Sequence, residues 1–225
     1  MRLISSFGIF AALLTLFTGC DEDWEVRRSA AVNRARGVVY NTDGCDMLYW
    51  PSNLPVSVGN FTDRRLKFVL GTHITTISYC PQSAGFGHFT CRKAGDPLIA
   101  DVPIPRGGCY NSASRFFDMG TDSLEMACAF CRSNNLEVFV SVRFNDTHDS
   151  AYDEKNGRFS PLFPKFKRDN PECLMGGPAK ENRPKFCNWS AVDFSHEKTR
   201  AHMRKFVRQL VENYDVDGIE YDFNR

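Results

Sequence analysis

The stretch Val216–Phe223, with sequence VDGIEYDF, decides the fold that this sequence predicts. It follows the clearest amphipathic helix of the chain and has the pattern of a strand. Alternate strand residues point to opposite faces, so one face carries Gly218, Glu220 and Asp222, and the other carries Ile219, Tyr221 and Phe223. In a parallel α/β sheet, side chains at the carboxyl ends of the strands lie where ligands bind. The stretch therefore predicts a parallel sheet with an acidic site at one edge.

Upstream, apolar runs and helical periodicity alternate along the chain. Strands are expected over residues 37–41, 74–79 and 136–142, and helices over residues 122–133 and 197–214. Another helix is expected to begin near Asp63, with Asn60 or Thr62 as its N-cap. Two long excursions, residues 81–120 and 150–195, follow the second and third strands. This is the β-α-β order of a parallel sheet.

The fold class follows from what accompanies these strands. Neither a Gly-rich dinucleotide fingerprint nor a P-loop is present, which argues against a nucleotide-binding doubly wound sheet. Long loops at the carboxyl ends of strands favour a (β/α)8 barrel, a fold of about 250 residues in its complete form. We therefore expect an α/β protein of the (β/α)8 TIM-barrel type, truncated to about four β/α units, over residues 37–225.

The amino-terminal residues have the pattern of an export signal. Arg2 precedes the apolar run Phe7–Phe17, which is too short to be a permanent membrane helix. The run ends in small residues before Cys20, as in a bacterial lipobox, although Phe17 stands where Leu is usual. We expect a signal peptide over residues 1–19, a lipid on Cys20 and a tether over residues 20–36. The alternative is a plain secretory signal cut near the same place. Either way, the protein is expected to be exported.

Composition limits the partners. The chain has 28 basic and 27 acidic residues without a basic stripe, so nucleic acid is not expected as a partner. Eight cysteines besides Cys20 in an exported chain favour disulfides, whose pairing the sequence leaves open. Cys128 and Cys131 lie inside an expected helix, so packing or a disulfide is preferred there to a redox or zinc site. Cys173 and Cys187 could staple the second excursion.

Three blocks carry a family resemblance: GVVYNTDGCD (37–46), RFNDTHD (143–149) and YDVDGIEYDFNR (214–225). Together with TISYC and GFGHF, they resemble exported bacterial glycoside-hydrolase-like (β/α)8 barrels, the glycosyl hydrolase-like 10 group and its relatives. The likeness covers the amino-terminal half of such a barrel. It implies hydrolysis of glycosidic bonds in carbohydrate outside the cytoplasm, without a cofactor.

The last block is also similar to the DGxDxDxE strand of chitinase-type barrels. Asp217, Gly218 and Asp222 match that motif, and Glu220 replaces its middle Asp. Asn224 stands where the motif has its catalytic acid, so the chitinase mechanism does not transfer.

Glycoside cleavage needs two carboxyl groups, about 5–5.5 Å apart for retention or about 6.5–9.5 Å apart for inversion. Asp222 and Glu220 share a strand face with Cα atoms about 6.5–7 Å apart. We predict Asp222 as nucleophile or general base, with Glu220 one layer deeper and the partner acid unassigned. The alternative for Glu220 is a buried ion pair with Arg143.

Other polar residues at strand ends are expected to bind substrate. Two of them, Arg143 and Asn145, could hold sugar hydroxyls or orient a carboxylate. The remaining candidates are Asn41, Asp43, Asp46, His88, Asp146, His148 and Asp149. Asp43 and Asp46 could instead only form a turn, and His88 could be an exposed loop residue. The last three could form a metal site or a self-capped loop.

Three hypotheses about function remain open. The first is a surface-anchored hydrolase. The second is a non-catalytic carbohydrate-binding lipoprotein that uses aromatic residues such as Phe86 and Trp189. The third is a fragment of a longer barrel without a function of its own.

Overall fold

The structure is a computed structural model that describes residues 23–82, 86–87, 90–95, 102–103 and 107–223. The chain divides into two units, residues 1–36 and 37–225. In the first unit, residues 23–32 form a helix within the segment predicted as a tether. The predicted signal peptide and Cys20 lie outside the described residues. Within the described part of the chain, no helix combines the length and apolar character needed to cross a membrane.

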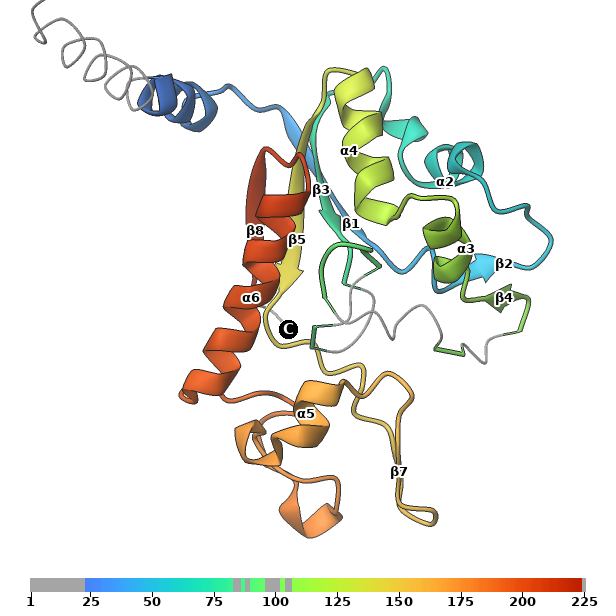
Figure 1. Ribbon diagram of the computed structural model, residues 1–225, viewed down its shortest axis with the longest axis vertical. Helices are drawn as coiled ribbons and strands as arrows, with labels where there is room; N and C mark the ends of the chain where they lie inside the picture. Colours follow the sequence, from blue (N-terminus) through green and yellow to red (C-terminus); the bar gives the residue numbers. More distant parts are fainter. Residues whose placement is uncertain (1–22, 83–85, 88–89, 96–101, 104–106, 224–225) are drawn as a thin grey trace, which may run out of the picture. The chain divides into compact units, whose positions relative to one another are not determined.

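The second unit is built on a four-stranded parallel sheet (Figure 1). Its strands are β1 (Val38–Asp43), β3 (Ile74–Cys80), β5 (Glu137–Arg143) and β8 (Gly218–Asp222). They lie in the order β1-β3-β5-β8, and each neighbouring pair is parallel. The predicted β-α-β order and parallel sheet are confirmed. The described strands form an open sheet, so the predicted barrel is not closed among these residues.

The strand order distinguishes two kinds of α/β sheet. In a doubly wound sheet the order reverses at a switch point, and helices cover both faces. Here the spatial order follows the sequence order without reversal. Because parallel crossovers are right-handed, such an order places successive helices on the same face, as in the wall of a barrel. The sheet therefore has the winding of a barrel segment.

Three helices form the main helical layer: α2 (Val58–Arg65), α4 (Ser123–Ser133) and α6 (Glu197–Asn213). Asp122 caps α4 by accepting a hydrogen bond of 2.9 Å from the Glu125 N–H, as expected of an N-cap. The prediction for α2 was wrong by five residues. Ser57 is its N-cap and accepts from the Asn60 N–H at 3.1 Å, so the helix starts before Asn60.

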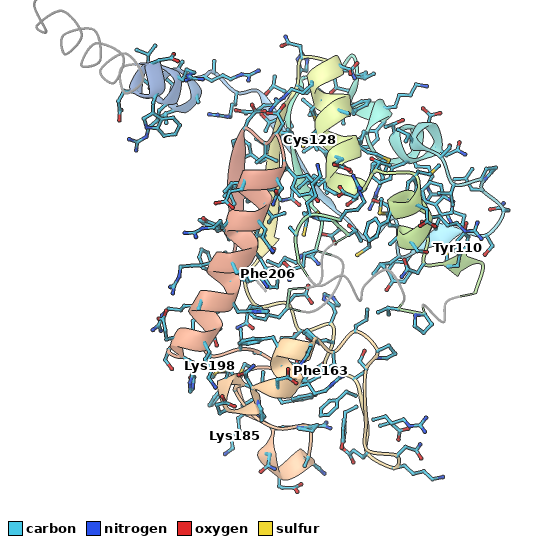
Figure 2. The ribbon with its side chains drawn as sticks, viewed as in Figure 1. Tyr110, Cys128, Phe163, Lys185, Lys198 and Phe206 are labelled. Carbon is cyan, nitrogen blue, oxygen red and sulfur yellow. The ribbon has the colours of Figure 1, made fainter. Side chains whose placement is uncertain are left out.

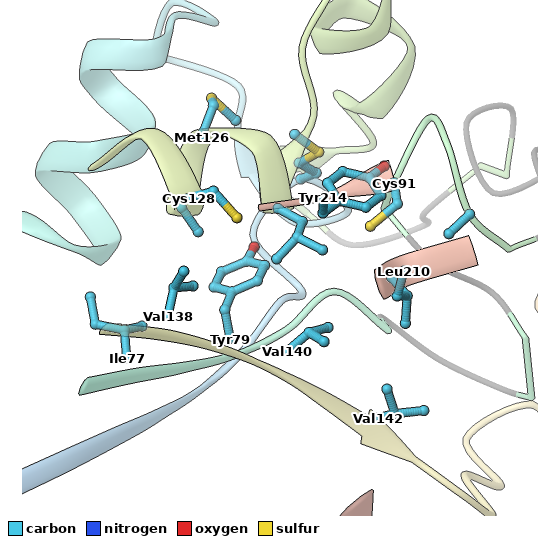
Figure 3. Packing of buried hydrophobic residues seen from close by; sticks show 14 of the residues in the cluster. Ile77, Tyr79, Cys91, Met126, Cys128, Val138, Val140, Val142, Leu210 and Tyr214 are labelled. Atoms are coloured by element: carbon cyan, nitrogen blue, oxygen red, sulfur yellow. The ribbon is translucent and has the colours of Figure 1, made fainter. Parts of the chain in front are cut away.

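The helical layer packs on the apolar face of the sheet. Tyr79, Val138 and Val140 are fully buried, and they point toward α4 and the end of α6 (Figure 3). Figure 2 shows the side chains on these elements, with Cys128 on α4 and Phe206 on α6. Each fully buried Val or Leu of this kind contributes about 1.5–3 kcal/mol through removal from water. This interface is the core of the second unit.

The two long excursions contain short elements that the sequence did not reveal. The first includes β4 (Cys109–Tyr110), which pairs with β2 (Trp50–Pro51), and α3 (Ala113–Asp118). The second includes the hairpin of β6 (Tyr152–Asp153) and β7 (Arg158–Phe159) and helix α5 (Lys165–Asp169). Single 3-10 turns are η1 (Lys67–Val69), η3 (Pro171–Cys173) and η4 (Lys180–Asn182).

The expected disulfides are not formed in this structure, where all eight cysteines after Cys20 are free thiols. Cys128 and Cys131 lie one turn apart on α4, and both side chains are buried in the core. Burial raises the pKa of each of these two thiols to about 12, unlike the acidic thiol of a redox motif. The disulfide that could have joined Cys173 to Cys187 is also absent, because both are free thiols; Cys173 is buried and Cys187 is exposed.

Candidate functional site

The face of the sheet opposite the helices is polar. On this face of β3 and β5 polar side chains predominate, interrupted by Phe139, and the residues on the other face, such as Ile77, Val138 and Val140, are buried and apolar. Parallel neighbours in register share a face, which places Ser141 beside Glu220 and Arg143 beside Asp222. The polar face carries, from β1 to β8, the side chains of Asn41, Asp43, Thr76, Ser78, Glu137, Ser141, Arg143, Glu220 and Asp222.

Glu220 is bonded to side chains from all three other strands. Its Oε1 accepts from Asn41 Nδ2 on β1 at 2.7 Å and from Ser141 Oγ on β5 at 3.2 Å. Its Oε2 accepts from the Ser78 hydroxyl on β3. The predicted alternative, an ion pair between Glu220 and Arg143, was therefore wrong. The partners of this carboxylate are the hydroxyl groups of two serines and the amide of Asn41.

The bond from Asn41 to Glu220 shows that the sheet is curved. In a flat sheet, β1 and β8 would be three strand spacings apart, about 14 Å. An Asn and a Glu side chain meet at 2.7 Å only if both strands turn toward each other. The polar face is therefore concave, which is the curvature of a barrel interior.

Arg143, the last residue of β5, is the centre of the site at the carboxyl edge. Its Nη2 forms an ion pair with Asp43, its Nη1 lies 3.1 Å from Asp146, and its Nε lies 4.0 Å from Asp222. The Arg143 side chain is 4% exposed, and Asp43 is 50% exposed. Burial lowers the pKa of the guanidinium, but the acidic groups around it, Asp43 among them, raise the pKa by more. Arg143 is thus a buried cation in contact with one exposed carboxylate, Asp43, and with the less exposed Asp222 and Asp146.

Asp146 connects this cluster to His148. One oxygen of Asp146 contacts Arg143, and the other accepts from the backbone N–H of His148 at 2.9 Å and lies 2.8 Å from its Nδ1. Asp146 is fully buried, whereas the imidazole is 57% exposed. The buried carboxylate therefore fixes the orientation of a solvent-facing histidine.

Asp149 is held by a separate buried ion pair. Its Oδ2 lies 2.6 Å from Lys167 Nζ on α5, and its Oδ1 accepts from Ser190 at 2.8 Å. Both charged side chains are fully buried. Burial raises the pKa of Asp149, which Lys167 partly opposes, and burial lowers the pKa of Lys167. This pair joins the second excursion to the end of β5 and places Asp149 away from solvent.

Other candidate residues have structural partners. Asp46 is buried and paired with Arg65 of α2. Asn145 exchanges two hydrogen bonds with the backbone of Val192, at 3.1 and 2.8 Å. His88 lies outside the described residues.

The aromatic residues expected to stack on sugars are not accessible. Phe86 is 0% exposed and Trp189 is 5% exposed, so neither presents a ring face to a ligand. Trp189 also donates its indole N–H to the Ser150 carbonyl at 3.1 Å. Both residues belong to the interior.

A metal site at Asp146, His148 and Asp149 is not supported by their partners, because Arg143 and Lys167 neutralise the two carboxylates. Among the residues that the structure describes, no group of three or more His, Cys, Asp or Glu side chains could hold a metal ion. Thiol chemistry is also disfavoured beside the site, because burial raises the pKa of Cys45 to about 11.

Sequence reasoning missed three polar residues that shape the site. Ser78 and Ser141 hold Glu220, and Gln82 accepts the backbone N–H of Arg143 at 3.0 Å. The two serines have a signal in the sequence, since each stands between apolar residues at period two in strands TISYC and VFVSV. A polar residue at that spacing marks the second face of the sheet.

No protein-family model and no curated protein sequence matches this chain. Solved structures with partial similarity include a noncanonic maltogenic α-amylase, AmyB, from Thermotoga neapolitana, at 17% identity and a TM-score of 0.42. Another is α-L-fucosidase isoenzyme 2 from Paenibacillus thiaminolyticus, at 14% identity and a TM-score of 0.42. The similarity covers 83% and 84% of this chain but only 39% and 24% of those proteins. The chain thus spans less than half of either.

Proposed function

We propose that this protein is glycoside-hydrolase-like and that its concave polar face binds carbohydrate outside the cytoplasm. The observation that carries the proposal is the pair of carboxylates on one face of β8. Asp222 lies beside the Arg143 guanidinium, and Glu220 lies one layer deeper within hydrogen bonds from Asn41, Ser78 and Ser141. Paired carboxylates in a polar hollow are what glycosidic hydrolysis requires.

In this proposal Asp222 is the nucleophile or general base. Arg143 Nε lies 4.0 Å from Asp222 and helps to position this carboxylate at the edge of the sheet. Glu220 supports the reaction from the layer below, where its hydrogen bonds fix the curvature of the sheet. The predicted export signal and a predicted lipid on Cys20 would place the protein at a membrane surface, facing extracytoplasmic carbohydrate.

The test is turnover of a panel of aryl glycosides and oligosaccharides by the full chain and by Asp222→Asn. Loss of a catalytic carboxylate is expected to lower kcat/KM by at least about 100-fold, the lower range for acid–base catalysis. Asp63→Asn on the exposed side of α2 is the matched control and should retain full activity. Wild-type protein that cleaves none of the panel, or Asp222→Asn that cleaves it normally, would refute the proposal.

One observation favours a second candidate function, carbohydrate binding without hydrolysis. Both oxygens of Glu220 are engaged by donors, and Arg143 is committed to Asp43 and Asp146. The exposed carboxylate of Asp43 can still accept hydrogen bonds from sugar hydroxyls, which is sufficient for binding without hydrolysis. Calorimetric binding of an oligosaccharide that the wild-type protein does not cleave would favour this function.

A further inference from the structure

Outside the carboxylates of β8, three features could have a further role: an apolar groove beside α6, the Asp146–His148 pair and Asp43. The groove has a volume of about 620 Å³ and is lined by apolar side chains such as Val207 and Tyr221, with arginines at its rim. Nothing in the described residues indicates what would cover it. The imidazole of His148 is joined to the site only through Asp146 and Arg143. Asp43 alone combines exposure with direct contact to the centre of the site.

We infer that Asp43, at the end of β1, is the proton donor that partners Asp222 in glycosidic cleavage. This inference rests on the proposed function and deepens it. Asp43 and Asp222 come from the two outer strands of the sheet, and the side chain of Arg143 lies between them. Nη2 and Nε are adjacent donors of one planar guanidinium. Glycosidic cleavage uses two carboxyl groups about 5–9.5 Å apart, and two carboxyl groups that contact one guanidinium are close neighbours.

Exposure separates Asp43 from the other acids of the cluster. Its side chain is 50% exposed and that of Asp222 is 21% exposed, whereas Asp146, Asp149 and Asp46 are 0–7% exposed. A proton donor must reach the glycosidic oxygen of a bound sugar, which excludes these three buried acids. Glu220 is also less suited, because its two oxygens are already bonded to side chains of three strands.

The contact with Arg143 leaves one oxygen of Asp43 for a substrate. Only Oδ1 of Asp43 contacts the guanidinium, and a carboxyl group can accept there through one oxygen. In this inference Oδ2 is the atom that gives the proton to the glycosidic oxygen.

The reaction balances with these two groups and water. As the bond between C1 and the leaving oxygen breaks, its electron pair stays on the oxygen, and the Asp43 proton moves to that oxygen. Asp222 either adds to C1 or takes a proton from the water that adds. In the first route one water then cleaves the glycosyl ester: its hydroxyl adds to C1, its proton goes to Asp43, and Asp222 is released as a carboxylate. In the second route Asp222 gives the proton it took from water to the solvent, and the solvent returns a proton to Asp43.

The experiment compares two aryl glycosides of the same sugar, one with a 2,4-dinitrophenyl group and one with a phenyl group. Dinitrophenolate leaves without a proton, whereas phenolate needs one. Asp43→Asn should therefore lose at least about 100-fold in kcat/KM on the phenyl glycoside and less than about 10-fold on the dinitrophenyl glycoside. Asp222→Asn should lose activity on both. Asn keeps an oxygen for Arg143, and far-ultraviolet circular dichroism checks the fold.

The outcomes separate the two proposals. Equal losses on both glycosides would make Asp43 a binding or positioning residue and overturn the inference. Full activity of Asp43→Asn on the phenyl glycoside would also overturn it, while turnover by the wild type leaves the proposed function standing. Wild-type protein that cleaves neither these glycosides nor any of the wider panel would remove the proposed function, and the inference with it.

Discussion

Two arginines at opposite ends of the sheet bind aspartates in similar ways but in different surroundings. Arg132, in the last turn of α4, lies 2.7 Å from both Asp215 and Asp217, which lead into β8. Arg143, at the end of β5, contacts Asp43 and Asp146. The Arg132 side chain is 37% exposed, whereas that of Arg143 is 4% exposed. Both clusters consist of an arginine bound to two aspartates, and they differ in how far water reaches the arginine.

That difference decides what each cluster does. Water solvates and screens an exposed pair, so such a pair contributes about 0–1 kcal/mol to stability. The attraction within a buried ion pair must offset the cost of removing both charges from water. Apolar side chains of similar volume at the same positions are often equally or more stable. The Arg132 cluster is thus a surface contact that joins α4 to the start of β8. The Arg143 cluster places charge at the edge of the sheet where the parallel strands end and ligands bind, which is the expected place for chemistry.

The largest expected effect comes from Arg143→Met. It leaves Asp146 buried without its cation, and breaking a buried pair costs about 3–5 kcal/mol. The comparable change Arg132→Met should cost less than about 1 kcal/mol, because water can solvate Asp215. Equilibrium urea unfolding of the three proteins measures both values. Equal losses for the two variants would show that burial does not distinguish the clusters.

A smaller effect is expected in double-mutant cycles. Replacing Arg143 and Asp146 singly and together, as Arg143→Met and Asp146→Asn, should give a coupling energy of about 1–3 kcal/mol, as for residues in one network. The cycle for Arg132 and Asp217 should give about 0.5 kcal/mol or less. Both cycles use the same urea titration. A larger coupling energy for the surface pair would reverse the comparison.

The sequence predicted the parts of the molecule that follow from periodicity. Strand β3, helix α4 and helix α6 lie within two residues of their predicted bounds, because each has a strong period and a clear end. The parallel order followed from alternation of strands and helices. It also placed Arg143 and Asp222 at the same edge, since the carboxyl ends of parallel strands meet there.

Partners across the sheet could not be predicted in the same way. One alternative for Glu220 was an ion pair with Arg143, but curvature brings Asn41 to it instead, and curvature has no local signal in the sequence. The Lys167–Asp149 pair depends on how the second excursion folds back, which the sequence did not reveal. The carbohydrate-binding hypothesis would use Trp189 and Phe86 at the surface, yet both are buried. Local patterns specify elements, and these errors all concern long-range contacts.

The smallest expected effect is the pH dependence of the Arg132 cluster. Hydrogen bonds from Arg132 lower the pKa of Asp215 below its usual 3.8. A lowered pKa adds stability that is present above the unfolded-state pKa and is lost as the pH falls through the folded-state value. The difference in free energy of unfolding between wild type and Arg132→Met is expected to be less than about 1 kcal/mol at pH 7. This difference, called the gap below, should therefore shrink below pH 3.8. Urea titrations from pH 7 to about pH 3 measure it, and 1 M salt should reduce the gap by screening. A gap that persists at low pH and high salt would mean that Arg132 stabilises the protein by packing its alkyl chain, not by its charge.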